Sequence, residues 1–318
     1  MTKSVVYFNR YTGREETEQI YGEKPMRWVY ETATGRLALR LLVRRAFFSR
    51  WFGWRMRRPS SRARIAPFIR EYGLDAAEFA DAPSDFASFD AFFSRKLKPA
   101  ARPIAHGTDG TDGDGTDPVA VFPADGRHLG FQDVSTVRAI YAKGQTFDLP
   151  ALLGDAALAQ RYRHGTLVCS RLCPVDYHRF HFPLAGTPAA AHPLNGWLYS
   201  VNPVALRRNI AWLWENKRSR ITLDAGPWGA VTLIVIGATN VGSMTFTYGT
   251  GVPVPKAAEA GFFSFGGSFV ATLFEAGKIR LADDLLRETA AGRELYARMG
   301  DTLGRRAADG DNAPRQTQ

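Results

Sequence analysis

The sequence predicts an α+β fold, and three observations along the 318-residue chain support this expectation. Apolar residues recur at roughly helical spacing among arginines in the first hundred residues. From Val119 onward, short apolar runs typical of β-strands alternate with turn residues. Helical spacing returns between positions 282 and 305, where several leucines stand among charged residues. Helices and strands that are segregated along a chain in this way are typical of the α+β class.

Residues 1–104 are expected to form a helical, basic N-terminal region. Eleven arginines and no acidic residue lie between Glu31 and Glu71. The net charge of the whole chain is +10, so this one segment accounts for all of the excess positive charge. Within this segment, residues 36–58 place Leu, Phe and Trp on a broad apolar face and arginines on the other. This pattern is typical of a helix that lies on an anionic membrane surface. A surface helix packed on its own domain and a nucleic-acid patch are two less favoured interpretations.

A second helix is expected over residues 84–97, SDFASFDAFFSRKL, with Ser84 or Asp85 as its N-cap. The phenylalanines of this helix would share one face and pack in the core, namely Phe86, Phe89 and Phe93. The low-complexity run at residues 105–118 carries four aspartates but lacks the spacing and the closing Glu of an EF-hand loop. It is therefore interpreted as a flexible insertion.

Residues 119–305 are expected to form a β-rich domain that ends in helix. Its β-like runs are VAVF (119–122), HGTLVCSRL (164–172), VTLIVIGA (231–238), GSMTFTYG (242–249) and SFVATLFE (268–275). The last residues, 306–318, are expected to be a disordered tail.

Composition excludes several classes of protein. Two cysteines are too few for a disulfide scaffold and favour a reducing compartment. No stretch approaches the 18 or so uncharged apolar residues of a membrane-spanning helix. The first residues, MTKSVVYFNRYTGREETEQ, lack the apolar core of a secretory signal.

The segment CSRLCPVDYHRFHFPLAG (169–186) is the densest cluster of reactive side chains in the sequence. Its cysteines and histidines could hold zinc through Cys169, Cys173, His178 and His181, but their spacing does not match a standard zinc finger. The two histidines could instead act as general acid and base, because imidazole titrates near neutral pH. The third interpretation is two structural histidines at the end of a strand.

Two further segments place polar residues at strand ends. Asp125 occupies the turn of FPADG (122–126), where Asp-Gly is also a common hairpin turn without any function. Gly266 and Gly267 precede Ser268, which opens a strongly apolar strand. With a base nearby and a relaxed backbone, the Ser268 hydroxyl could attack the preceding carbonyl carbon. A simple glycine bulge before a core strand is the alternative.

In its motifs, the chain resembles the phosphatidylserine decarboxylase family of pyruvoyl-dependent enzymes, and in particular the branch that carries Gly-Gly-Ser. The resemblance spans about two thirds of the chain and rests on motifs in the family's order. They are SFDAFFSRKLKPAARPI (88–104), FPADG (122–126), CPVDYHRFHFPLAGT (173–187), YSVNP (199–203), ENKR (215–218), VIGATNVGSM (235–244), GFFSFGGSFVATLFE (261–275) and MGDTLG (299–304). The chain departs from the family's usual pattern at Phe269, where Thr is more common, at ENKR and in the insertion at 105–118.

The resemblance implies a role for each matching residue. Ser268 would be the precursor of a covalent pyruvoyl cofactor, generated by self-cleavage between Gly267 and Ser268. Asp125 and His181 would activate the Ser268 hydroxyl as in other catalytic triads. His178 would be a second site histidine that serves substrate binding or protonation. Residues 119–305 would then be a catalytic domain, without a metal ion.

The resemblance also implies the reaction and the partners. The pyruvoyl group would form an imine with the headgroup amine of phosphatidylserine and yield phosphatidylethanolamine and CO2. The two self-cleavage fragments would stay associated, and a homodimer is compatible with the sequence. The protein would be a peripheral membrane protein that binds an anionic surface, on the cytoplasmic face of a bacterial-type cell membrane, and would not bind nucleic acid. A non-catalytic membrane-docking β-protein and a zinc-dependent hydrolase are the alternatives.

Overall fold

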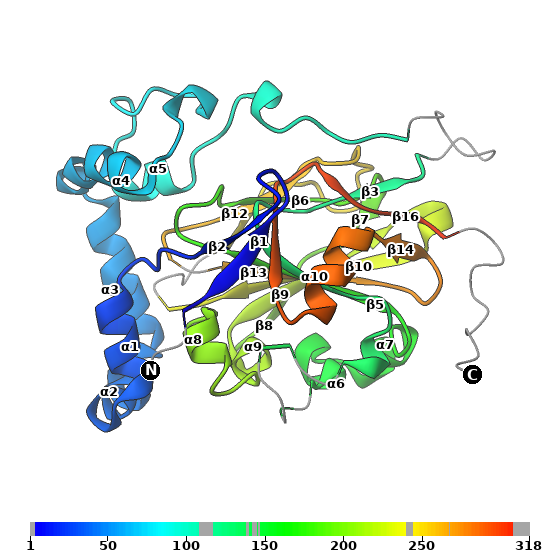
Figure 1. Ribbon diagram of the computed structural model, residues 1–318, viewed down its shortest axis with the longest axis horizontal. Coiled ribbons are helices and arrows are strands. Elements are labelled where there is room, and N and C mark those ends of the chain that lie inside the picture. Colours follow the sequence, from blue (N-terminus) through cyan, green and yellow to red (C-terminus); the bar gives the residue numbers. More distant parts are fainter. Residues whose placement is uncertain are drawn as a thin grey trace.

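The computed structural model describes residues 4–107, 117–137, 140–141, 145, 147–239, 244–266 and 268–307. Strands form stacked sheets, and helices lie on one face of the larger sheet and along one side of the molecule (Figure 1). The fold is therefore of the α+β class that the sequence predicts.

A ten-stranded sheet runs through the middle of the molecule. Its order is β2 (Arg14–Thr17), β1 (Val6–Asn9), β15 (Glu294–Ala297), β4 (Gly126–Phe131), β5 (Thr166–Leu172), β13 (Ser268–Phe274), β10 (Ala230–Gly237), β9 (Arg218–Asp224) and β7 (Thr187–Pro188), and β8 (His192–Leu194) also pairs with β9. Only the β1–β15 pair is parallel among the described pairings. The strand that opens with Ser268 thus lies in the interior of the sheet, between β5 and β10.

Strand β13 is buried on both faces, and its alternating side chains enter two different cores. Val270 and Phe274 pack in a core with two smaller sheets, while Phe269 and Leu273 pack in a core with helices. The smaller sheets are β11 (Met244–Phe246), β12 (Glu259–Phe263) and β6 (Arg179–His181), and β14 (Ile279–Leu281), β16 (Thr302–Arg306) and β3 (Val119–Val121). The helices are α6 (Leu149–Leu153), α7 (Ala156–Arg161), α8 (Pro203–Leu206) and α9 (Trp212–Glu215). By this alternation Ser268 shares the face of Val270, on the side of β6 and β12.

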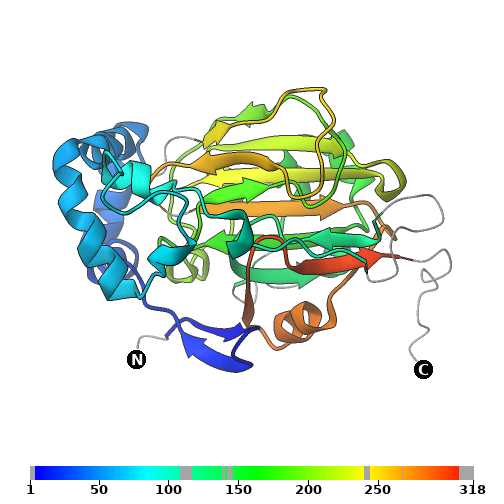
Figure 2. The ribbon, with the colours of Figure 1, turned by 90° about the horizontal axis from the view of Figure 1, so that it is seen from above.

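The N-terminal helices form a separate layer at one side of the strands, as both ribbon views show (Figure 1 and Figure 2). We call residues 23–72 the N-terminal helical layer. It contains α1 (Glu23–Glu31), α2 (Ala33–Ala38), the π-helix η1 (Leu39–Val43), α3 (Ala46–Arg57), the 3-10 helix η2 (Pro59–Arg64) and α4 (Ile65–Tyr72). The short helices η3 (Ala76–Glu78), α5 (Phe89–Phe93) and η4 (Pro99–Ala101) lead from this layer to the strands, and η5 (Val134–Thr136), η6 (Gly226–Trp228) and α10 (Asp283–Ala290) complete the described helices.

An aromatic cluster ties the N-terminal helical layer to the segment before Ser268. Phe68 of α4 and Phe89 of α5 contact each other edge to face, and Phe89 contacts Phe265 at 5.2 Å between ring centroids. Phe52 of α3 stacks on Phe265 at 5.6 Å. Burial of aromatic surface in this cluster, at about 25 cal/mol per Å², fixes the helices against residues 265–266.

Two expectations for the first half of the chain need correction. Residues 1–104 do not begin as helix, because β1 and β2 form a hairpin that joins the large sheet. The helical pattern over 36–58 is present but interrupted at Arg45, whose backbone is extended. The arginine-rich stretch is therefore a bent succession of helices rather than one.

The helix expected over 84–97 is also shorter than predicted. Only Phe89–Phe93 is helical, and its N-cap is Ser88, whose side chain accepts from the Ala91 amide at 3.2 Å, not Ser84 or Asp85. The chain leaves the helix because Leu97 bridges Phe79 as extended backbone. The phenylalanine stripe is nevertheless confirmed as core, since Phe86, Phe89 and Phe93 are all buried.

The helical end expected over 282–305 is wrong beyond residue 290. Helix α10 stops because Gly292 takes a left-handed backbone conformation, with φ of 71°. The chain then returns as β15 and β16, so Leu295 belongs to a strand. Arg306, which we expected to begin the tail, is the last residue of β16.

The flexible insertion at 105–118 and the tail at 306–318 lie mostly outside the described residues. Of the insertion, Asp117 is described, and its carboxylate binds Lys256 Nζ at 2.5 Å. No helix in the described part of the chain is long and apolar enough to cross a membrane.

Candidate active site

Ser268 lies at the first position of β13, paired with Leu172 of β5 and Gly237 of β10. Its side chain is fully buried, and its Oγ has no hydrogen-bond partner among the described residues. A buried hydroxyl without a partner is costly, by about 1–3 kcal/mol, and is uncommon away from functional sites. Gly266 has φ of 142°, which L-residues rarely adopt. Gly267 lies outside the described residues.

His178 is buried next to this segment, in the loop before β6. Its Nδ1 donates to the Asp176 carbonyl at 3.0 Å, so Nε2 is left as the acceptor, and Nε2 has no partner among the described residues. The Phe93 ring lies 3.8 Å from the imidazole centroid. Burial lowers the pKa of His178 to about 3, although the backbone of Asp176 and of Gly266 partly opposes this. His178 is therefore neutral at physiological pH, with a bare nitrogen near Gly266.

His181 is the last residue of β6, and its imidazole is held from both sides. Nδ1 donates to the Ala257 carbonyl at 2.8 Å, and Nε2 faces the Tyr177 hydroxyl at 3.3 Å. Ala257 has φ of 63° and is the only described non-glycine residue with positive φ. The backbone that places this carbonyl is therefore strained. Burial lowers the pKa of His181, while the charges of Glu259 and Asp125 oppose the shift. The tautomer with a basic Nε2 is thus the stable one.

Asp125 is buried in the turn between β3 and β4, and its carboxylate is fully hydrogen-bonded. Arg102 donates to both of its oxygens, and the Met299 amide donates to Oδ1 at 2.9 Å. No hydrogen bond joins Asp125 to His181 in the described structure, and the Ala257 carbonyl holds the imidazole tautomer. Asp125 acts on His181 through its charge, which raises the pKa of the imidazole.

The four predicted side chains therefore share one region without touching one another directly. His178 lies against the Gly266 backbone, and Asp125 lies close enough to His181 to influence its protonation. Ser268 is on the sheet face that packs against the strand of His181. In this uncleaved chain the groups are close but not linked as Asp–His–Ser.

Several buried charged residues that sequence reasoning missed support this region. Arg127 donates to Asp176 at 2.6 Å, and Asp176 in turn accepts from the Cys173 amide, which fixes the loop that carries His178. Arg171 binds Glu18 and Glu294 at 2.6 and 2.5 Å. The alternation of the strands would have placed these arginines in a core, but sequence gave no sign of their acidic partners, which come from distant segments.

The cysteines are placed differently from what a zinc site requires. Cys169 packs in the helix-side core, and Cys173 Sγ accepts from Arg171 at 3.0 Å. Burial raises the pKa of both thiols. No group of three or more His, Cys, Asp or Glu side chains able to hold a metal ion occurs among the described residues.

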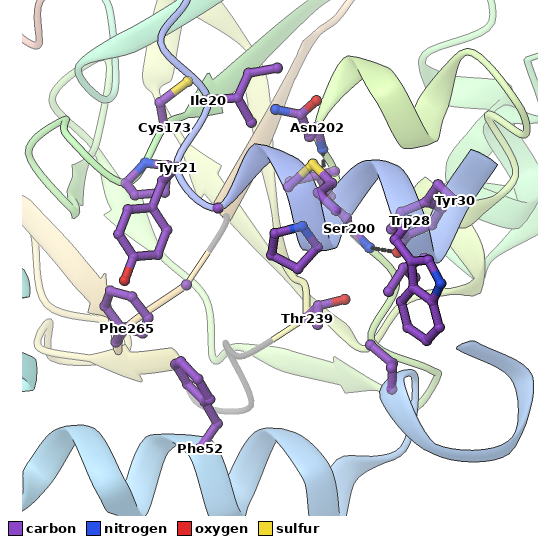
Figure 3. Close-up of a pocket in the computed structure, with 18 of the residues that line it drawn as sticks. Ile20, Tyr21, Trp28, Tyr30, Phe52, Cys173, Ser200, Asn202, Thr239 and Phe265 are labelled. Carbon is purple, nitrogen blue, oxygen red and sulfur yellow. Dashed lines mark hydrogen bonds between the residues drawn. The ribbon is translucent and has the colours of Figure 1, made fainter. Parts of the chain in front are cut away.

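A pocket of about 800 Å³ opens between the N-terminal helical layer and the sheet, and it reaches Gly266 (Figure 3). Most of its wall is apolar, with Phe52 and Phe265 at one side and Ile20 and Trp28 at others. Polar and charged side chains also line it, among them Glu18, Arg171, Ser200, Asn202 and Thr239. The pocket can hold an amphipathic molecule with its polar end near the Gly-Gly-Ser segment.

Comparison with known proteins agrees with these features. A family model described as phosphatidylserine decarboxylase matches residues 89–305. The chain is 40% identical to the phosphatidylserine decarboxylase proenzyme of Chlamydia trachomatis serovar D, over 96% of this chain and 98% of the relative. The corresponding proenzymes of Chlamydia pneumoniae (40%; 94% and 96%) and Fusobacterium nucleatum (37%; 95% and 98%) are similarly related. The resemblance seen in the sequence is confirmed, and the chain belongs to the phosphatidylserine decarboxylase family.

Proposed function

We propose that this chain is a proenzyme that cleaves itself between Gly267 and Ser268 and then converts phosphatidylserine to phosphatidylethanolamine and CO2. One observation carries the proposal. The Ser268 hydroxyl is buried without a described partner, two positions after Gly266 with its unusual backbone conformation, and on the sheet face that packs against the strand of His181. Family membership supplies the reaction.

In self-cleavage, His181 Nε2 takes the proton of the Ser268 hydroxyl, and the Asp125 charge stabilises the resulting imidazolium. The serine oxygen attacks the Gly267 carbonyl carbon, and the acyl group moves from nitrogen to oxygen as an ester. β-Elimination then leaves Gly267 with a C-terminal carboxylate. Residue 268 becomes dehydroalanine, which tautomerises to an imine; one water then hydrolyses the imine, releasing ammonia and leaving a pyruvoyl group whose ketone oxygen comes from that water.

The surroundings of Ser268 fit a pyruvoyl group. They are buried, Ser268 Oγ has no described partner to be displaced, and the pocket reaches Gly266, two positions before Ser268. When formed, the group supplies an electron sink for the decarboxylation. This chain's own contribution is to hold the substrate amine against residue 268, to exclude water, and to supply in His178 Nε2 a base that takes up a proton and passes it to the α-carbon.

The substrate lies in the 800 Å³ pocket in this proposal. Its headgroup is held near Gly266 by the polar groups of Ser200, Asn202 and Thr239. Its acyl chains extend along the apolar wall that the N-terminal helical layer provides, where Met26, Leu42 and Phe48 lie. Phosphatidylserine combines a charged headgroup with long apolar chains, which is the division of polarity that this pocket has.

Peripheral binding to an anionic membrane is supported by the outer face of the N-terminal helical layer. Five large apolar side chains there, none of which lines the pocket, are 47–64% exposed, namely Leu37, Leu41, Phe47, Trp51 and Trp54. Arg36, Arg40, Arg44 and Arg208 line a second recess of about 380 Å³ at the same layer. Exposed aromatics beside unpaired arginines are typical of an interfacial helix. The cytoplasmic face of a bacterial-type membrane is the location that we propose.

The two fragments, 1–267 and 268–318, are expected to stay associated. The smaller one contributes β13 to the interior of the large sheet, and it also contributes β15 and β16. Separation would expose β13, which is buried along its whole length. Formation of a homodimer stays a prediction.

The decisive experiment supplies purified protein with phosphatidylserine vesicles and no pyridoxal phosphate. We expect CO2 and phosphatidylethanolamine, loss of activity with hydroxylamine, which traps ketones, and no loss with a metal chelator. Intact mass should show a 51-residue fragment with a blocked N-terminus. Cleaved protein that resists carbonyl reagents, or an uncut chain with full activity, would refute the proposal.

A further inference from the structure

Three motifs that are far apart in the sequence converge on the carboxylate of Asp125. Arg102 comes from the segment 88–104, Asp125 from the turn 122–126 and Met299 from the segment 299–304. The Arg102 Nε lies 2.9 and 3.0 Å from the two Asp125 oxygens, and Nη2 lies 2.5 Å from Oδ2. The Met299 amide donates to Oδ1 at 2.9 Å. The carboxylate is thus held in a planar, two-pronged grip that only a guanidinium can provide.

Arg102 is itself held in place and buried. Its Nη1 donates to Glu78 at 3.0 Å and to the Ala101 carbonyl at 2.6 Å. Burial alone would lower the pKa of Arg102, but its bonds to Asp125 and Glu78 outweigh burial and raise it. Arg102 is 8% exposed and Asp125 is 1% exposed. The ion pair between them is therefore buried, and removal of one partner has a larger effect than it would for an ion pair on the surface.

We propose that Arg102 is a positioning residue for self-cleavage, because its fork holds the Asp125 carboxylate in the place and orientation from which its charge supports the His181 imidazolium. The inference rests on the proposed role of Asp125. Since Asp125 makes no described hydrogen bond to His181, its influence depends on where its carboxylate is held, and Arg102 holds it. A displaced or rotated Asp125 would leave the imidazolium unsupported as Ser268 loses its proton.

Other charged or titratable groups also face Asp125, and they set its background potential. Its charge acts on groups of the neighbouring loops and strands, namely Arg95, Asp176, Tyr177, His181 and Tyr296. Arg95 is the second cation among them, but its described hydrogen bonds are to backbone carbonyls and not to Asp125. Arg102 is therefore the cation that is hydrogen-bonded to Asp125, and its removal should disturb the position of the Asp125 carboxylate most.

The test measures the rate of self-cleavage of freshly translated full-length chain on denaturing gels. We expect Arg102→Gln to cleave at least about tenfold more slowly than wild type, because the Asp125 carboxylate loses the two-pronged grip that holds it in place. Arg102→Lys should recover part of the rate, because an ammonium can still bind one carboxylate oxygen but lacks the fork.

Arg293→Gln is the matched control, because Arg293 also binds a buried carboxylate, that of Glu288, through Nε and Nη2 at 2.9 and 2.7 Å, and makes no described contact with segments 122–126 or 299–304. It should cleave as wild type. Wild-type cleavage in Arg102→Gln, or a rate in Arg102→Lys no higher than in Arg102→Gln, would overturn the inference. If Arg102→Gln does not fold, Arg102→Lys decides, because wild-type rates in that variant would show that the fork is not used. If Asp125→Asn cleaves normally, the proposed role of Asp125 itself fails, whereas a slow Asp125→Asn with a normal Arg102→Gln refutes only the inference.

Discussion

The N-terminal helical layer and the β-sheet core treat charge and apolar surface in opposite ways. None of the eleven arginines between positions 36 and 70 lies within 4.0 Å of a carboxylate oxygen in the described structure, and several rest on aromatic rings instead. In the core, by contrast, Arg102, Arg127 and Arg171 are buried and each binds at least one carboxylate. The layer thus exposes apolar aromatic side chains to solvent, while the core buries ionised side chains in ion pairs.

This difference separates two tasks. Buried ion pairs cost desolvation but fix direction, which suits a site where a serine and two histidines must be placed without water. Exposed arginines and aromatics gain little in water but much at an anionic surface. Substitutions in the core should therefore affect the chemistry, and substitutions in the layer should affect membrane binding.

The strongest way to break the comparison is to remove the hydroxyl of Ser268. Ser268→Ala should leave a single full-length chain and no activity, because no other group can attack the Gly267 carbonyl. Trp51→Ser, in the layer, should cleave completely. A denaturing gel and intact mass decide, and any cleavage at 267 in Ser268→Ala would contradict the mechanism.

Asp125 and the two histidines should show the next largest effects. Asp125→Asn should slow self-cleavage by up to about 10⁴-fold, the loss seen for the equivalent change in serine proteases. His181→Ala should fail to mature for want of a base. His178→Ala should cleave but turn over slowly, which a comparison of fragment yield with CO2 release can show. If His178→Ala slowed self-cleavage and decarboxylation equally, His178 would serve both steps and the proposed division between His178 and His181 would be wrong.

Membrane binding should respond to the layer by a smaller factor. Arg50 and Arg57 lie on α3 outside any described ion pair, and each should contribute about 1 kcal/mol at an anionic surface. Replacing both by Gln should weaken binding to anionic vesicles by roughly thirtyfold, without loss of self-cleavage. The control changes Arg163, in the turn after α7, and Arg305, in β16, to Gln, because both lie outside the N-terminal helical layer. Equal weakening in both variants would mean that net charge alone matters.

The smallest effect concerns stability against acid, which should distinguish buried from exposed histidines. Burial lowers the pKa of His128 to about 3, so the native state stays neutral where the unfolded chain gains a proton below about pH 6.5. Stability is therefore lost as the pH falls through 6.5 toward 3, at up to about 1.4 kcal/mol per pH unit for this residue. His128→Gln in the uncleaved Ser268→Ala chain should flatten the dependence, measured by urea unfolding. His164→Gln, at an exposed position, should not.

Local patterns predicted the α+β class and five of the strands, β3, β5, β10, β11 and β13, and they singled out the candidate residues, because apolar alternation and turn residues act over a few positions. They failed where distant contacts decide. Leu295 was expected in a helix, but pairing with β4 makes it strand. The helix expected to reach residue 97 ends at Phe93, and Leu97 instead bridges Phe79 as extended backbone. The grip of Arg102 on Asp125 joins residues 23 apart, and the Met299 amide lies 174 positions away, so no spacing rule could show them.

The interior position of β13 makes the mature protein dependent on its own history. Once the bond before Ser268 is cut, the information that folded one chain is divided between two pieces, and the smaller one must supply a strand between β5 and β10. If the mature protein unfolds, refolding requires the two fragments to meet, because β13 of one must pair with β5 and β10 of the other. In the precursor the same pairing forms within a single chain. The lifetime of the mature protein is then governed by how slowly it unfolds rather than by an equilibrium, so the uncleaved precursor is the only form that can fold repeatedly.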